Sequence, residues 1–247
     1  MTILIIFQFS GYKNFKIFYL GKFHNAWLKC FFPSLPSYSR FIEIMRRVGI
    51  YFIIFNAVYS GKKSGIYYID SSKLPVCSIK RAKRHKVFSG LSEFGKTSMG
   101  WFFGLKIHLV INNLGEIIAF KLSSGNMHDV TLADVLCENL HGLIFGDKGY
   151  IGQKIFEKLF AHGLKLITEV RKNMKHKELF AEEKQLLKGR SKIETIIGYL
   201  KNNFMIWHTR HRSVVNAVTH LLAAITAYAL QPIKFHTNIE KNLVKVC

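Results

Sequence analysis

The chain has 247 residues, of which 49% are hydrophobic, and 36 lysines and arginines against 15 acidic residues give a formal net charge of +21. This length and apolar content suffice for one sizeable core and exclude a disordered chain. The charge predicts a polyanionic partner. Nucleic acid fits better than a membrane, because no segment offers about 18 unbroken apolar residues. The most apolar stretch, 214–230, contains polar residues and is predicted to be a core helix.

The N-terminal region, residues 1–60, mixes aromatic and basic residues and breaks at Pro33 and Pro36 before a predicted helix from Tyr38 to Arg47. We expect a small helical region that faces DNA. Its aromatic side chains have two interpretations, base stacking and core packing, and an aromatic stripe more often belongs to a core. The opening apolar run has no basic residue before it and no cleavage site after it. We therefore expect no signal peptide and a cytoplasmic protein.

From Gly65 the pattern changes to alternating strands and helices. Strands are predicted at Gly65–Asp70, Trp101–Asn112, Glu116–Leu122, Leu143–Asp147 and Leu164–Val170, and helices at Asp129–Leu136 and Ile151–His162. The link Asn113-Leu114-Gly115 predicts a tight hairpin between the second and third strands. A meander followed by alternating helices and strands predicts an α/β fold, with a mixed sheet flanked by helices and the first and fourth strands as neighbours.

Three acidic residues are candidates for chemistry. Asp70 and Asp147 close two predicted strands, and Glu194 is expected in the middle of a helix. If the first and fourth strands are neighbours, the two aspartates face each other at one edge of the sheet. Carboxylates placed in this way can hold a pair of divalent metal ions, which cut or join phosphodiester bonds.

The predicted helix around Glu194 has a polar stripe and an apolar stripe. Arg190, Glu194 and Lys201 fall within about 40° of one another on a helical wheel. The apolar stripe, which would pack on the core, comprises Ile193, Ile196, Ile197, Leu200 and Phe204. The two basic residues are placed to meet phosphate oxygens. Taken alone, a solvated ion pair is the more frequent interpretation of Arg190 and Glu194, and the strand-end aspartates reverse that preference.

Basic residues lie on both sides of this predicted site. The run after the first strand contains Lys80, Arg81, Lys83, Arg84 and Lys86. Arg210 and Arg212 follow the Glu194 helix, and Lys148 adjoins Asp147. A solvated charged face is the usual alternative for such runs, but the excess of positive charge along the chain favours contacts with DNA phosphates.

Three further features are less informative. His128 and Asp129 follow the third predicted strand, where they would support the metal site or contact DNA, or simply begin a helix with Asp129 near its cap. Gly95-Lys96-Thr97 lacks the earlier glycine of a phosphate-binding loop, so no nucleotide cofactor is expected. No role is assigned to the scattered cysteines, Cys30, Cys77, Cys137 and Cys247.

Several segments between Tyr68 and Pro232 resemble the DDE transposases of bacterial insertion sequences, most closely insertion-sequence family nine-eighty-two. They are IDSSKLPVC, RHKVFSGLSEFGKTSMGWFFGLKIHLVIN, FGDKGYIGQKIFEKLF, LITEVRKNMK, and HTRHRS followed by an apolar helix. The resemblance implies a ribonuclease H-like core whose acidic triad, Asp70, Asp147 and Glu194, binds two magnesium ions, with Mn²⁺ as a substitute. A Tyr, Arg, Glu, Lys signature surrounds the last acid in related transposases. Arg190 and Lys201 match it, whereas Leu187 replaces the tyrosine.

The resemblance also implies a reaction and an organisation. The enzyme would hydrolyse phosphodiesters at the element ends and transfer the freed 3′-hydroxyl into target DNA, as a homodimer associated with the nucleoid. The expected domains are an N-terminal region at 1–60, a catalytic domain at 61–212, and an apolar helix with a basic tail at 213–247. Family members usually carry several dozen residues before the position equivalent to Met1. A truncated, catalytically decayed DNA-binding remnant therefore stays an alternative, as does a ribonuclease H-like nuclease.

Overall fold

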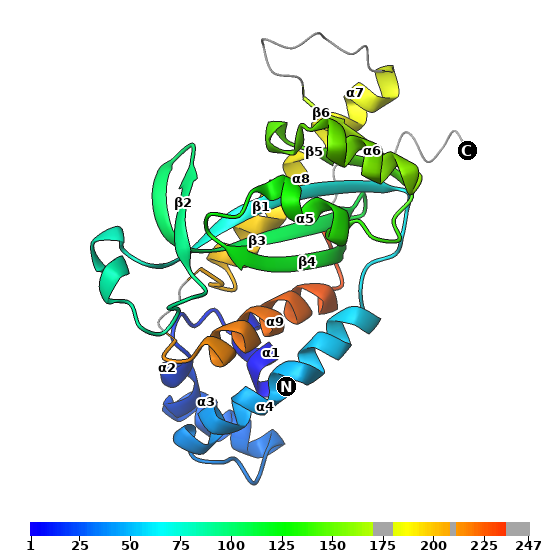
Figure 1. The fold of residues 1–247 in the computed structure, drawn as a ribbon. Helices are drawn as coiled ribbons and strands as arrows, with labels where there is room; N and C mark the ends of the chain where they lie inside the picture. Colours follow the sequence, from blue (N-terminus) through cyan, green and yellow to red (C-terminus); the bar gives the residue numbers. More distant parts are fainter. Residues whose placement is uncertain (170–179, 208–210, 236–247) are drawn as a thin grey trace.

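The computed structural model describes residues 1–169, 180–207 and 211–235, with the backbone alone for 22–25. A curled, mixed sheet is flanked by helices on both faces, and a helical region lies beneath it in the view of Figure 1. The strands are β1 (Ile66–Cys77), β2 (Glu93–Thr97), β3 (Gly100–Asn112), β4 (Ile117–Ser124), β5 (Gly142–Gly146) and β6 (Leu164–Thr168). Their order is β2-β3-β1-β5-β6, with β4 also paired to β3.

The central strand β1 pairs differently on its two sides. It is antiparallel to β3 and parallel to β5, so the first and fourth predicted strands are neighbours, as expected. The sequence predicted that Asp70 is the last residue of β1, and this prediction was wrong. Strand β1 continues to Cys77 along its antiparallel partner β3. The parallel pairing with β5 ends earlier, at Tyr68 opposite Phe145. Asp70 therefore lies just beyond the point where β1 and β5 separate.

Strand β2 was missed by the sequence pattern. It shares one edge of β3 with β4, pairing along Gly100–Gly104 while β4 pairs along Leu105–Ile111. Its sequence, EFGKT, contains a glycine and two charged residues, and only Gly95 among its five residues is buried. A short edge strand of this kind lacks the alternation that marks a half-buried strand.

Helices cover the two faces of the sheet and form two cores. On one face, α8 (Ser191–Asn202) and α9 (Val214–Leu230) pack on side chains such as Tyr68 and Leu109. On the other, α5 (Asp129–Leu136) and α6 (Gln153–Ala161) pack on Tyr67 and Ile69. Because side chains alternate along a strand, Asp70 shares the face of Tyr68, toward α8.

The N-terminal region folds into α1 (Thr2–Phe9), α2 (Phe15–Leu20), α3 (Lys22–Phe31) and α4 (Tyr38–Val58). Helix α4 extends well beyond the predicted end at Arg47, because it packs along α9. Asn56 links the two helices, donating to the carbonyl of Leu222 (3.3 Å) and accepting from Thr226 Oγ1 (3.2 Å). The described aromatic side chains from α1, α2 and the start of α4 pack together, which confirms the core interpretation for Phe7, Phe15, Phe18, Tyr19 and Phe41.

Helix α9 is the core helix that the sequence predicts. Its buried side chains reach both the sheet and α4, so it joins the N-terminal helices to the rest of the fold. Within the described ranges, no helix is long and apolar enough to cross a membrane. Cys30, Cys77 and Cys137 are free thiols, and Cys247 lies outside the described residues.

Two glycine substitutions test the packing of the sheet against that of a helix. A Cβ on Gly104 would lie 2.3 Å from the carbonyl oxygen of Leu74 and 2.9 Å from Cα of Pro75, beside the irregularity in β1. We expect Gly104→Ala to destabilise the protein by about 1–3 kcal/mol.

Gly198, inside α8, has nothing within 4 Å of such a Cβ. Gly198→Ala should stabilise by about 0.5–1 kcal/mol. Urea unfolding of both variants measures this, and the same sign for both would contradict the packing described.

Candidate active site

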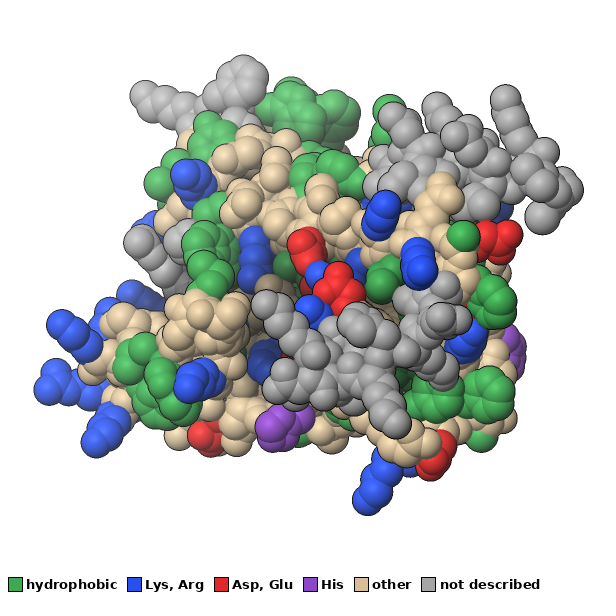
Figure 2. Space-filling model, turned by 90° about the horizontal axis from the view of Figure 1, so that it is seen from above, with side chains coloured by type: hydrophobic (Ala, Val, Ile, Leu, Met, Phe, Trp, Pro, Cys, Tyr) green, Lys and Arg blue, Asp and Glu red, His purple; other side chains and the backbone are tan. Residues whose placement is uncertain are grey.

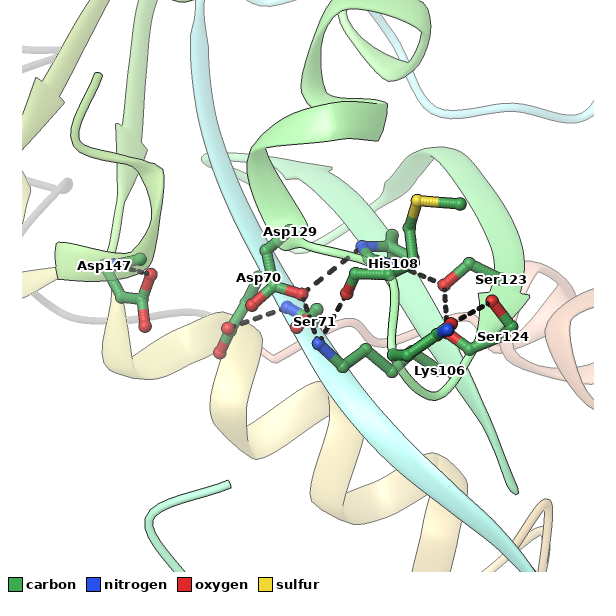
Figure 3. A network of polar contacts seen from close by, with 11 residues as sticks. Asp70, Ser71, Lys106, His108, Ser123, Ser124, Asp129 and Asp147 are labelled. Atoms are coloured by element: carbon green, nitrogen blue, oxygen red, sulfur yellow. Dashed lines mark hydrogen bonds and ion pairs between the residues drawn. The ribbon is translucent and has the colours of Figure 1, made fainter. Parts of the chain in front are cut away.

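Asp70 and Asp147 come from adjacent strands. Asp147 follows the last residue of β5 and caps the short helix η2 (Lys148–Tyr150), where it accepts a hydrogen bond from the amide of Gly149 (2.8 Å). Asp70 accepts a hydrogen bond from the amide of Ser71 (2.7 Å). Figure 3 shows the two carboxylates on neighbouring segments at the same end of the β1–β5 pair. The predicted proximity of the two aspartates follows from the parallel pairing.

Arg190 joins the third acid to this pair. One guanidinium nitrogen lies 2.8 Å from Oε1 of Glu194, and another lies 3.9 Å from Oδ2 of Asp70. Glu194 is in the first turn of α8, not mid-helix as predicted, because α8 begins at Ser191. Its side chain is 53% exposed, whereas that of Asp70 is 17% exposed. Glu194 thus lies at the border between buried and wet surface, as its place between the two stripes predicts.

Asp70 is buried, and both Asp147 and Glu194 are near enough to affect its pKa. Burial raises the pKa of Asp70 from its ordinary value of 3.8 to about 7. The amide of Ser71 and the charge of Arg190 act to lower this pKa, while the charges of Asp147 and Glu194 raise it further. Burial is the largest of these effects, so the charged form of Asp70 lacks full compensation for the water that it has lost. The site would therefore gain from a cation.

Lys201 lies on the same face of β1. Its ammonium donates to Oγ of Ser72 at 2.6 Å, and Ser72 is two residues from Asp70, so the two side chains point to the same side. Burial lowers the pKa of Lys201, the neighbouring Lys73 lowers it further, and Asp70 opposes both effects. The polar stripe of α8 is therefore aimed at β1. The predicted apolar stripe is buried throughout: Ile193, Ile196, Ile197, Leu200 and Phe204.

The three acids have the ligand chemistry that a hard divalent cation needs, but their side chains do not converge on one point. Carboxylate oxygens are the ligands that Mg²⁺ and Mn²⁺ prefer. Within the part of the chain that is described, however, no three His, Cys, Asp or Glu side chains already converge on a point that could hold a metal ion. The guanidinium of Arg190 lies between Asp70 and Glu194 and pairs with Glu194. It supplies the positive charge that a metal ion would bring.

The predicted DNA-binding residues lie on several surface segments. Those after β1 are all exposed, four of them on the short helix η1 (Ile79–Arg84): Lys80, Arg81, Lys83, Arg84 and Lys86. Lys148 pairs with Glu169 at 3.2 Å, and Arg212 is exposed just before α9. Arg210 lies outside the described residues. Figure 2 shows acidic side chains near the middle of one face with Lys and Arg side chains beside them.

His128 and Asp129 form the start of α5, the second of the two roles predicted for them. Asp129 accepts from Lys106 (3.1 Å) and lies 4.0 Å from His108, which pairs with Ser123 at 2.8 Å. Burial lowers the pKa of His108 to about 4, with Lys106 lowering it and Asp129 raising it. This network, drawn in Figure 3, lies on the α5 face of the sheet, opposite Asp70. Its charges are already matched within the fold.

The comparison with protein families agrees with this geometry. A family model described as "Transposase DDE domain" matches residues 60–214, more than half of the chain. The chain belongs to the DDE transposase domain family. The matched span begins before β1 and ends where α9 begins, so it includes Asp70, Asp147 and Glu194. The predicted resemblance to DDE transposases is confirmed at this level. No curated protein matches the chain.

Sequence reasoning missed two serines beside Asp70, and it expected Tyr150, next to Asp147, to contact DNA, which its burial contradicts. Ser71 and Ser72 directly follow Asp70, and strand alternation would have placed Ser72 beside it once β1 was known to continue. Tyr150 is 1% exposed, and its hydroxyl has no hydrogen-bond partner in the described structure. Burial raises its pKa, and Asp129, Asp70 and Asp147 raise it further. Only the fold reveals that this tyrosine lies behind the aspartates.

Replacing Asp70 tests the electrostatics. Because folding raises its pKa from 3.8 to about 7, the folded state binds the proton more tightly, and stability is lost as pH rises through this interval. In chelator at pH 8, Asp70→Asn should be more stable than the wild type by about 2–4 kcal/mol, with the gain shrinking toward zero near pH 4. Urea unfolding across pH measures this. Asp134→Asn, at an exposed pair with Lys158, is the matched control. Equal stability of Asp70→Asn and wild type at pH 8 would contradict the burial of a charged Asp70.

Proposed function

We propose that this transposase domain moves an insertion sequence by hydrolysing phosphodiesters at the element ends and joining the freed 3′-hydroxyls to target DNA. We further propose a ribonuclease H-like core of the kind found in insertion-sequence family nine-eighty-two, acting on nucleoid DNA in the cytoplasm. The observation that carries the proposal is the contact chain from Asp70 through Arg190 to Glu194. It brings β1 and α8 together beside Asp147, within the span that matches the family.

Asp70, Asp147 and Glu194 would hold two Mg²⁺ ions, which Mn²⁺ can replace. Bound ions of this kind lower the pKa of water and stabilise the oxygens that attack and leave phosphorus. The raised pKa of Asp70 supports this assignment, since a cation favours its charged form. For Glu194 to serve as a ligand, Arg190 has to release it.

Arg190 and Lys201 would act on the phosphate. A guanidinium released from Glu194 can present two parallel N–H groups to phosphate oxygens, and the ammonium of Lys201 is fixed near Asp70 by Ser72. Both chemical steps are in-line displacements at phosphorus. Water attacks first, releasing the 3′-oxygen, which takes up a proton. That 3′-hydroxyl then attacks the target phosphodiester, loses its proton and displaces a second 3′-oxygen.

Cleavage of end-labelled DNA tests this proposal. Linear DNA that carries the flanking terminal repeats should be cut at the repeat ends with Mg²⁺ and not with chelator. Glu194→Gln and Asp147→Ala should each lower the rate on the order of 10²-fold or more while DNA binding survives. Glu157→Gln, an exposed acid on α6 paired with Gln153, is the control.

The same assay separates the alternatives. Cutting without joining of 3′ ends to target DNA would identify a nuclease. Binding without metal-dependent cutting by the wild type would identify a catalytically silent remnant. A rise in melting temperature with Mn²⁺ that is lost in Asp70→Asn would locate the metal site independently of cleavage.

A homodimer is the proposed assembly, and the outer face of α4 supports it. One side of α4 is buried against α9, yet the opposite side is also apolar and exposed: Ile50 (55%), Ile53 (51%), Ile54 (55%) and Val58 (73%). No charged residue occurs from Gly49 to Ser60 in a chain of net charge +21. Such a face suits neither phosphate nor water. A second copy of α4 offers it a matching apolar surface in a two-fold dimer.

Sedimentation velocity on the full chain tests the dimer. Ile53→Glu with Ile54→Glu should raise the dimer dissociation constant more than about tenfold, because each carboxylate would be buried without a partner. Ile17→Glu, at a 60% exposed site on α2, should leave association unchanged. A wild type that stays monomeric at micromolar concentration would overturn the assignment of this face.

A further inference from the structure

The β2–β3 hairpin is a projecting arm with an unusual tip. Its strands pair as far as Thr97 with Gly100, so Ser98 and Met99 form the link, and Oγ1 of Thr97 donates to the carbonyl of Gly100 (3.2 Å). Met99 is 84% exposed. Beyond the end of β4, no other strand of the described residues pairs with the outer edge of this hairpin, and Figure 1 shows it standing away from the sheet. The arm is therefore accessible on several sides.

The arm presents an aromatic ring beside a cation. Lys96 and Trp101 are direct cross-strand partners, and Nζ of Lys96 lies 5.8 Å from the centre of the Trp101 ring. Trp101 is nevertheless 59% exposed. The lysine orients the indole without covering it. An indole held in place and open to solvent is suited to stack against a flat partner.

Strand alternation places the basic helix η1 on the same side of the arm. The pair Phe94–Phe103 lies two residues inward from Lys96–Trp101 and so shares its face. On that face Phe103 packs with Ala82 of η1 and with Phe88, and the ring of His85 lies 6.5 Å from that of Phe103. Helix η1, with its exposed cations, therefore packs on the face of the arm that also carries the indole.

The net positive charge of η1 and the arm favours a polyanionic partner. Residues 78–101 contain six lysines and arginines and one acid, Glu93. At the left edge of Figure 2, on the side where Figure 1 places β2, Lys and Arg side chains project around hydrophobic ones. Cations interleaved with an exposed aromatic are the pattern of surfaces that bind unpaired bases between phosphates. Exposed apolar side chains such as Met can also wedge between base steps and unstack them.

We propose that the tip of the β2–β3 hairpin is a second DNA site, in which Trp101 stacks on a base unstacked from the duplex and Met99 wedges the step open. The basic side chains of η1 hold the phosphates on either side of that step. The inference rests on the proposed function only in taking DNA as the ligand, and its residues are separate from the acids of the catalytic site. It assigns to this arm the recognition of distorted DNA.

Equilibrium binding of the full chain to fluorescent duplexes tests the proposal. One duplex is intact and the other contains an abasic position or a mismatch. The wild type should prefer the distorted duplex. Trp101→Ala should lose about 5- to 100-fold in affinity for it, as expected from the loss of one stacked base, while Trp101→Phe should keep most of the affinity. Phe160→Ala, which removes an exposed aromatic ring on α6, should bind like the wild type.

A second readout reports stacking directly. 2-Aminopurine opposite the abasic position should change its fluorescence on binding the wild type and not on binding Trp101→Ala. Unchanged affinity and fluorescence in a folded Trp101→Ala would overturn the proposal and leave the transposase assignment intact. A change of oligomeric state without a change in DNA affinity would also overturn it, by identifying β2 as a strand that pairs with protein. Failure of the wild type to bind any DNA would overturn the proposed function itself.

Discussion

The site depends on the two-sided pairing of β1. One edge of this strand is parallel to β5 and the other is antiparallel to β3, and the two pairings end at different residues. Strand β1 continues beyond the end of β5. Asp70 therefore lies within the sheet, whereas Asp147 lies just after the end of its strand. The alternation of side chains along β1 then decides that α8, and not α5, faces Asp70. These two facts place both aspartates and the helix that carries Glu194.

Arg190 places positive charge between two of the three acids. It lies at the N-cap of α8, one turn before Glu194 and within ion-pair distance of Asp70. Its charge offsets part of the repulsion among the acids, yet the pKa of Asp70 remains well above the ordinary value because the carboxyl is also buried. The protein therefore carries an acidic site that is only partly neutralised by its own residues. Carboxylates that are only partly compensated suit the divalent cations proposed for this site.

Much of this arrangement could be predicted from the sequence. The predicted ends of β1 and α4 were wrong, each because of the residues in that segment. Helices α5 and α9 and strand β3 match the predictions within a residue. The early end predicted for β1 came from the polar run Ser71-Ser72-Lys73, which resembles a loop but is paired throughout with β3. The end predicted for α4 failed because its second half is apolar on both sides, so periodicity gave no single face. Side-chain contacts such as those of Arg190 and Lys201 depend on the position of α8 over the sheet, which no local pattern contains.

The direction of the β2–β3 arm and the contacts of its tip depend on different residues. At its base, β2 takes over from β4 along the edge of β3, and the backbones crowd there. A Cβ on Gly125 would lie 2.5 Å from the carbonyl oxygen of Glu93, and one on Gly95 would lie 2.2 Å from that of Gly125. The direction of the arm is thus set by main-chain packing among glycines. Residues at the tip contribute little to that packing, so they are free to change during evolution while the arm keeps its position relative to the acids.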